Sequence, residues 1–222
     1  MLKKFALIVA GGSGSRMQNS TPKQFLEISG KPVLMHTLSA FYNFDPSIEI
    51  ILVLPEDQLE TWKKLCNNHN FSIPHKLAHG GKMRFDSVKN GLEQISENGI
   101  VFIHDGVRPL VSAQTIKNCL NTTIEKGNAL PVVPVSESVR YVDENASKAL
   151  DRTKYFLVQT PQTFRVDEIK QAYQQPYSGL FSDDASVLEN MGTKINTVAG
   201  NRENIKITFP EDIRLAEVLL NA

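Results

Sequence analysis

The sequence FALIVAGGSGSRMQNSTPK, residues 5–23, decides which fold we expect. Residues 5–10 are a short apolar run that ends at glycines, which is typical of a buried β-strand. Residues 11–14 carry almost no side chains, so their backbone N–H groups can approach a phosphate closely. Arg16 and Lys23 follow as two cations. A strand, a glycine turn and fixed positive charge together predict a polyphosphate site.

Two common phosphate-binding motifs do not occur in this stretch. A P-loop requires Gly, any four residues and then Gly-Lys-Ser/Thr, and that string is absent. A dinucleotide fingerprint that starts at Gly12 requires a third glycine where Met17 stands. For the glycines alone, a plain turn without a ligand remains the alternative.

The residues around Arg16 and Lys23 favour a ligand, because they resemble a known family. The two blocks are Gly12-Ser13-Gly14-Ser15-Arg16 and Pro22-Lys23-Gln24-Phe25-Leu26. They are similar to the G-x-G-x-R and P-K-Q signature of nucleotidyltransferases that activate sugars and polyols. Within that family, the sequence is most similar to the cytidylyltransferases that act on 2-C-methyl-D-erythritol 4-phosphate. The related enzymes that act on ribitol 5-phosphate are the alternative.

Composition narrows the class of protein further. The 222 residues suggest one α/β domain, residues 1–222, and the 24 basic and 24 acidic side chains leave no net charge. Without a global basic field, we expect no nucleic-acid partner. Cys66 and Cys119 have no metal-binding spacing and are expected to be reduced packing residues of a cytoplasmic protein. No signal peptide or membrane span is expected either.

Strands and helices alternate along the chain. Apolar runs predict strands at 48–54, 74–79, 99–103, 129–135, 155–159 and 195–198. Helices are expected after Pro32 and at 56–68, 82–95, 112–126, 166–173, 182–191 and 210–220. With the resemblance, this pattern predicts a single Rossmann-like nucleotidyltransferase domain with a mostly parallel central sheet.

Two further blocks follow predicted strands, where ligands bind in open α/β sheets. Gly80-Gly81 precedes a helix that contains Ser87, and His104-Asp105-Gly106-Val107-Arg108-Pro109 follows the fourth strand. Asp105 can hold a ribose hydroxyl or Mg²⁺, and Arg108 a second anion; an ordinary Asp–Arg turn pair is the alternative. The resemblance implies a set of nucleotide-binding residues: Ala10, Gly11, Gly12, Gly14, Gly81, Ser87, Asp105 and Gly106.

The segment 136–152 interrupts the alternation. It reads as two short strands with little apolar surface of their own, so it must pack on something else. The resemblance implies an arm that grips a second subunit, which gives a homodimer. It also implies a set of acceptor-binding residues: Asp105, Arg108, Ser138, Arg152, Thr160 and Ser182. Ser138 and Ser182 stand where the family usually has threonine, and the hydroxyl is kept.

The implied reaction is attack of a polyol phosphate on the α-phosphorus of CTP, with release of pyrophosphate, in non-mevalonate isoprenoid synthesis. The nucleophile is already an anion, so the task is to stabilise charge on the transferred group. The resemblance assigns this to Arg16, Lys23 and Lys206 with Mg²⁺, held mostly by the CTP phosphates. A glycosyltransferase is disfavoured because Gly106-Val107, not an Asp-x-Asp motif, follows Asp105. A non-catalytic nucleotide sensor has little reason to keep the three cations.

Overall fold

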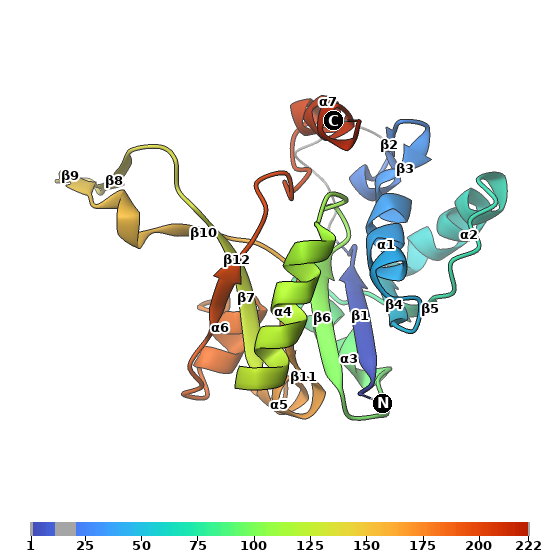
Figure 1. Ribbon diagram of the computed structural model, residues 1–222, viewed down its shortest axis with the longest axis horizontal. Coiled ribbons are helices and arrows are strands. Elements are labelled where there is room, and N and C mark those ends of the chain that lie inside the picture. Colours follow the sequence, from blue (N-terminus) through green and yellow to red (C-terminus); the bar gives the residue numbers. More distant parts are fainter. Residues whose placement is uncertain (1, 12–20, 222) are drawn as a thin grey trace.

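The computed structural model describes residues 2–11 and 21–221, and it contains a large central sheet (Figure 1). The strands of this sheet are β1 (Lys4–Val9), β4 (Glu49–Leu54), β5 (Lys76–His79), β6 (Ile100–Asp105), β7 (Asn128–Pro134), β10 (Phe156–Val158), β11 (Gln162–Arg165) and β12 (Thr197–Ala199). Their order is β10-β7-β11-β6-β1-β4-β5, and β12 pairs with β7. The predicted α/β fold with a mostly parallel sheet is confirmed.

Helices cover both faces of the sheet. The longer helices are α1 (Val33–Phe44), α2 (Leu59–Asn68), α3 (Arg84–Glu93), α4 (Ala113–Lys126), α5 (Val166–Ala172), α6 (Asp184–Glu189) and α7 (Pro210–Leu220). Alternate residues of β1 point to opposite faces, as the pleat requires. Leu7 lies in one core with α3, α5 and α6, whereas Ile8 lies in the other with α1, α2 and α4. Because both faces of β1 are buried, its sequence is a continuous apolar run.

The centre of the sheet is parallel and one side is mixed. β1 pairs in parallel with β4 and β6, and Val9 is in register with Asp105. The carboxyl ends of these strands therefore meet at one edge. The antiparallel strand β11, between β6 and β7, was not predicted. Its four residues include buried polar Gln162 and Thr163, so no apolar run marks it in the sequence.

The arm is confirmed as a separate excursion. β8 (Val139–Val142) and β9 (Ser147–Leu150) pair with each other in a two-stranded sheet, and β2 (Glu27–Ile28) and β3 (Lys31–Pro32) form another small sheet. Figure 1 shows β8 and β9 projecting away from the central sheet. A short 3₁₀ turn, η4 (Arg152–Lys154), leads from the arm back to β10.

Helix boundaries follow local chemistry. Ser112 caps α4 as predicted, because its Oγ accepts the N–H of Thr115 at 3.1 Å. α6 begins at Asp184 rather than Ser182, because the Asp183 carboxylate caps the N–H of Ser186 at 2.9 Å.

None of the helices found in residues 2–11 and 21–221 has both the length and the apolarity to cross a bilayer.

Candidate active site

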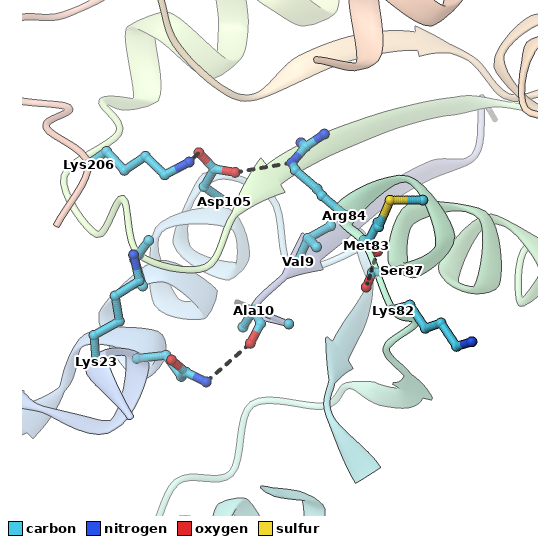
Figure 2. A pocket seen from close by; sticks show the side chains of 12 residues that line it. Val9, Ala10, Lys23, Lys82, Met83, Arg84, Ser87, Asp105 and Lys206 are labelled. Carbon is cyan, nitrogen blue, oxygen red and sulfur yellow. Dashed lines mark hydrogen bonds and ion pairs between the residues drawn. The ribbon is translucent and has the colours of Figure 1, made fainter. Parts of the chain in front are cut away.

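A cavity of about 300 Å³ opens at the carboxyl ends of β1 and β6 (Figure 2). We call it the first cavity. Its described lining is Val9, Ala10, Gly11, Lys23, Gln24, Lys82, Met83, Arg84, Ser87, Asp105, Val107 and Lys206. The predicted residues Ala10, Gly11, Lys23, Ser87 and Lys206 are therefore brought together with Asp105, although up to 196 positions separate them in the chain.

The segment that carries Lys23 is fixed on two sides. The buried Gln24 amide donates to the carbonyl of Ala10 at 3.1 Å and to Oε1 of Gln58 at 2.5 Å. Lys23 Nζ donates to the carbonyl of Ile207 at 3.1 Å. The end of β1 and the cation of the P-K-Q block are thus held in one arrangement.

The loop before α3 forms the opposite wall. Ser87 Oγ accepts the N–H of Gly81 at 3.0 Å and donates to the carbonyl of Met83 at 3.0 Å. A Cβ on Gly81 would lie 2.2 Å from the Cβ of Asp86, so only glycine fits there. A Cβ on Gly106 would lie 2.8 Å from that of Ala10, so the β1 and β6 ends also require close backbone approach. Close packing therefore requires glycine at two of the predicted site positions, Gly81 and Gly106.

Asp105 stands at the centre of three cations. Its carboxylate lies 3.0 Å from Lys206 Nζ, 3.2 Å from Arg108 Nε and 3.6 Å from Arg84 Nε. Figure 2 shows Lys206 and Arg84 pointing toward it from opposite sides. Burial alone would raise the pKa of Asp105, but these three charges outweigh it and hold that pKa well below its usual range. Asp105 is therefore ionised, and the cluster keeps net positive charge.

Arg84 was missed by the sequence reasoning. Its Nη1 and Nη2 donate to the buried carboxylate of Asp184 at 2.7 and 2.6 Å, and Tyr173 Oη donates to the same carboxylate at 2.6 Å. This pairing ties the start of α3 to the start of α6. The signal that could have found it is the block of Gly80-Gly81, Arg84 and Ser87-Val88, which is similar to a Gly-Gly, Arg, Ser-Val block of the family.

A second cavity of about 270 Å³ adjoins the first. Its described lining is Arg84, Asp105, Arg108, Val158, Gln159, Thr160, Gln162, Ser182, Asp183 and Lys206. The predicted residues Arg108, Thr160 and Ser182 therefore face the same space. Arg84, Asp105 and Lys206 line both cavities, so they form the wall that the cavities share.

The hydroxyl of Thr160 is engaged inside the protein. His104 Nε2 lies 3.0 Å from the carbonyl of Arg108, which can only accept, so this nitrogen carries the proton. His104 Nδ1 therefore accepts from Thr160 Oγ1 at 3.0 Å, and that oxygen accepts the N–H of Asp105 at 3.1 Å. Burial lowers the pKa of His104 to about 4, so it stays neutral near pH 7. This network fixes the turn that carries Asp105 and Arg108.

Four predicted residues that the structure describes do not line either of the two cavities of this chain: Gly81, Gly106, Ser138 and Arg152. Ser138 and Arg152 lie exposed at the two ends of the arm, where Arg152 Nη1 donates to the carbonyl of Ser136 at 2.5 Å. Gly12, Gly14 and Arg16 lie outside the described residues.

The oxygen ligands around the first cavity are too few to enclose a Mg²⁺ ion by themselves. In residues 2–11 and 21–221, no three His, Cys, Asp or Glu side chains gather to enclose a metal. Asp105 is the single acid in the described lining, and three cations already surround it. Mg²⁺ commonly takes one carboxylate together with waters and substrate phosphates. The residues therefore fit an ion that arrives on a phosphate ligand.

Comparisons with known proteins agree with this geometry. The sequence profile of the family described as IspD, 2-C-methyl-D-erythritol 4-phosphate cytidylyltransferase, matches residues 5–222. A relative of that name from Bacteroides fragilis is 52% identical over 215 residues, which are 97% of this chain and 98% of the relative. Another from Bacteroides thetaiotaomicron is 49% identical, over 99% of this chain and 100% of the relative.

Solved structures give the same result. The crystal structure of 4-diphosphocytidyl-2C-methyl-D-erythritol synthase from Anaerococcus prevotii aligns with a TM-score of 0.85 at 26% identity, over 100% of this chain and 97% of that one. The resemblance predicted from the sequence blocks is confirmed over the whole chain. The chain belongs to the 2-C-methyl-D-erythritol 4-phosphate cytidylyltransferase family.

Proposed function

We propose that this protein transfers CMP from CTP to 2-C-methyl-D-erythritol 4-phosphate, giving CDP-methylerythritol and pyrophosphate. The observation that carries the proposal is the wall shared by the two cavities. One cavity can hold the nucleotide and the other the polyol phosphate, and Arg84, Asp105 and Lys206 line both. The reacting phosphate groups then meet beside fixed positive charge.

In this proposal, the first cavity takes CTP. The backbone around Ala10 and Gly11 and the Gly81–Ser87 loop approach the base and ribose. We also assign Gly106 to nucleotide binding, together with Gly12 and Gly14, which lie outside the described residues. The ribose hydroxyls lie toward Asp105, whose ionised carboxylate can accept hydrogen bonds.

Transfer requires no general base. A phosphate oxygen of the acceptor forms a bond to the α-phosphorus of CTP, and the bond to the pyrophosphate oxygen breaks. Arg16, Lys23 and Lys206 stabilise the charge on the transferred group and on the leaving pyrophosphate. Asp105, the single acid in the described lining of the first cavity, would help to hold a Mg²⁺ ion, which would supply charge neutralisation on the phosphate oxygens.

The second cavity takes the acceptor, whose phosphate pairs with Arg108 beside Thr160 and Ser182. Two further predicted residues, Ser138 and Arg152, are exposed on the arm of the same chain. We propose a homodimer in which each arm completes the partner's site. A planar guanidinium such as that of Arg152 suits a phosphate, because it binds two oxygens at once.

Exposed apolar residues support the dimer. Tyr141 and Val142 in β8 are 54% and 68% exposed, and Phe156 and Leu157 in edge strand β10 are 51% and 59% exposed. An exposed apolar strand at a sheet edge invites pairing with another chain. A symmetric dimer would cover the arm and β10 together.

The test is pyrophosphate release from CTP and Mg²⁺ with either acceptor. We expect release with 2-C-methyl-D-erythritol 4-phosphate and much slower release with ribitol 5-phosphate. The opposite preference would assign the protein to ribitol phosphate, and no release with any polyol phosphate would remove the proposal.

Since CTP is a cytoplasmic metabolite and Cys66 and Cys119 are free thiols, we also propose a cytoplasmic location.

A further inference from the structure

Residues 204–207 run beside the shared wall and touch each described cation that we assign to the reaction. The carbonyl of Asn204 accepts Arg108 Nη1 at 2.8 Å, and the carbonyl of Ile207 accepts Lys23 Nζ at 3.1 Å. Lys206 belongs to the same segment and reaches Asp105 at 3.0 Å. The position of this segment therefore sets the spacing of Lys23, Arg108 and Lys206.

Regular secondary structure does not hold this segment. It lies between β12 and α7 and belongs to neither a helix nor a strand. Its backbone reaches the β6 turn through the N–H of Ile207, which donates to the carbonyl of Val107 at 2.9 Å. On the side of the second cavity, the attachment must come from side chains.

Asn204 supplies that attachment. Its side chain is completely buried, and its Nδ2 donates to the carbonyl of Thr160 at 2.8 Å. The neighbouring Gln159 amide donates to the carbonyl of Asn201 at 2.8 Å. One buried amide thus joins the segment with Lys206 to the connection between β10 and β11, which lines the second cavity.

The oxygen atom of the Asn204 amide also indicates that the side chain acts as a hydrogen-bond donor. Asn204 Oδ1 is buried and has no hydrogen-bond partner in residues 2–11 and 21–221. Rotating the amide would place Oδ1 against the carbonyl of Thr160, where two acceptors would face each other. A buried acceptor without a donor is unfavourable. The side chain therefore contributes through Nδ2, which donates to the carbonyl of Thr160 at 2.8 Å and to Oε1 of Gln159 at 3.5 Å.

We propose that Asn204 is a positioning residue for the transfer reaction, which acts by fixing the segment that spaces Lys23, Arg108 and Lys206. This inference rests on the proposed function. Asn204 makes no contact with substrate in this account. Its effect comes through the cations, whose placement to within about 1 Å decides the rate by as much as about 10²-fold.

Asn128 provides a matched control. It is also a buried asparagine, and its Nδ2 also donates to a backbone carbonyl of a distant segment, that of Lys194, at 3.0 Å. However, it starts β7, at the edge of the sheet opposite both cavities. Asn204→Ala and Asn128→Ala thus both remove a buried amide donor, one near the site and one far from it. Asn128→Ala also removes the two bonds that its Oδ1 accepts from Asn196, at 2.9 and 3.1 Å, so the control perturbs the fold at least as strongly.

The experiment measures thermal stability, kcat and both KM values for the two variants beside the wild type. We expect both variants to lose stability, but only Asn204→Ala to lose about 10- to 100-fold in kcat, with a smaller change in the KM for CTP. Equal kcat in the two variants would overturn the proposal. An inactive wild type would instead count against the proposed function.

A double-mutant cycle separates positioning from general loosening. If Asn204 acts through the cations, Asn204→Ala should lower kcat by a smaller factor when Lys206→Ala is already present than it does in the wild type, because one of the three cations that it positions is then gone. Fully additive losses would contradict the proposal. Gln159→Ala loosens the same segment at Asn201 and serves if Asn204→Ala does not fold. Wild-type kcat in a folded Gln159→Ala variant would also count against it.

Discussion

The cleft at the end of β6 and the arm are opposite in construction. Around Asp105, charged side chains from β6, α3 and the 204–207 segment pair with one another, and the central carboxylate is only 10% exposed. On the arm, charged and apolar side chains are exposed, and the two strands pair with each other. Breaking a buried ion pair costs much free energy, whereas exposed bonds such as those of Arg140 with Ser147 and of Arg152 with Ser136 hold the arm's side chains only weakly.

This contrast between the cleft and the arm indicates which parts of the site a single chain can form. The cleft brings distant residues of one chain into contact through their own ion pairs and hydrogen bonds, which fix the positions of the cations. The arm carries Ser138 and Arg152, which are exposed and line neither cavity of their own chain. In the proposed dimer, Ser138 and Arg152 act on the site of the partner chain.

The largest effect is expected at the cleft cations. Lys23→Ala should lower kcat by roughly 10²–10³ with a smaller change in CTP affinity, because Lys23 stabilises charge that develops during transfer. Arg16→Ala should behave alike. Steady-state kinetics test this, with the exposed Lys63→Ala as control. A change in KM alone would mean uniform binding and would contradict the mechanism.

Next in size is the cost of breaking the buried pair behind the cleft. Asp184→Asn removes the charge that Arg84 and Tyr173 share, and should lower the free energy of unfolding by about 3 kcal/mol. Urea denaturation measures it. The exposed arm variant Arg140→Ala should stay within about 0.5 kcal/mol of wild type. Equal losses in both would erase the contrast between the two regions.

A third effect depends on pH. Burial lowers the pKa of His104 to about 4, whereas the unfolded chain has about 6.5. The unfolded state therefore binds a proton first, and stability present above pH 6.5 is lost as the pH falls toward 4. We expect the free energy of unfolding to fall by about 2 kcal/mol between pH 7 and pH 5.

His104→Gln removes this titration and should give a flatter profile over the same range. Asp105 contributes only at lower pH, because its pKa in the folded protein lies well below its usual value of about 3.9, and the unfolded chain takes up the proton first as the pH falls through that value. An equally steep profile in His104→Gln would show that another group is responsible.

The smallest effect on folding is expected on the arm. Val142 is 68% exposed, so Val142→Ser should change the free energy of unfolding by less than about 0.5 kcal/mol. If the arm is covered in a dimer, the same change should weaken self-association in sedimentation equilibrium. Unchanged association would place the dimer contact elsewhere.

Local patterns predicted most of the fold. Apolar runs marked β1, β4 and β6, and the hydroxyl of Ser112 marked the start of α4. β11 was missed because its four residues pack between two strands through tertiary contacts, and Gln162 buries an amide that bonds to Ala185 N–H at 2.8 Å. No periodicity in the sequence reports such pairing.

Site residues could be predicted from the sequence only where they stand in a recognisable motif. Lys23, Asp105 and Lys206 stand in recognisable blocks, and the structure brings them together. The network of Arg84 with Asp184, 100 positions apart, was not predictable, because it depends on how α3 and α6 pack. The family blocks suggested Thr160 as a ligand, but they could not show that its hydroxyl serves His104 and Asp105.

One measurement tests most directly whether two chains build each site. Arg152→Ala and Lys23→Ala proteins, each inactive alone, are mixed and allowed to exchange subunits. If Arg152 acts on the partner, a mixed dimer has one site with both lesions and one with neither. Activity should then return to about a quarter of wild type, since half of the dimers are mixed. If mixing restores no activity although subunits exchange, or if the protein sediments as a monomer, Arg152 does not act across a dimer and the account is wrong.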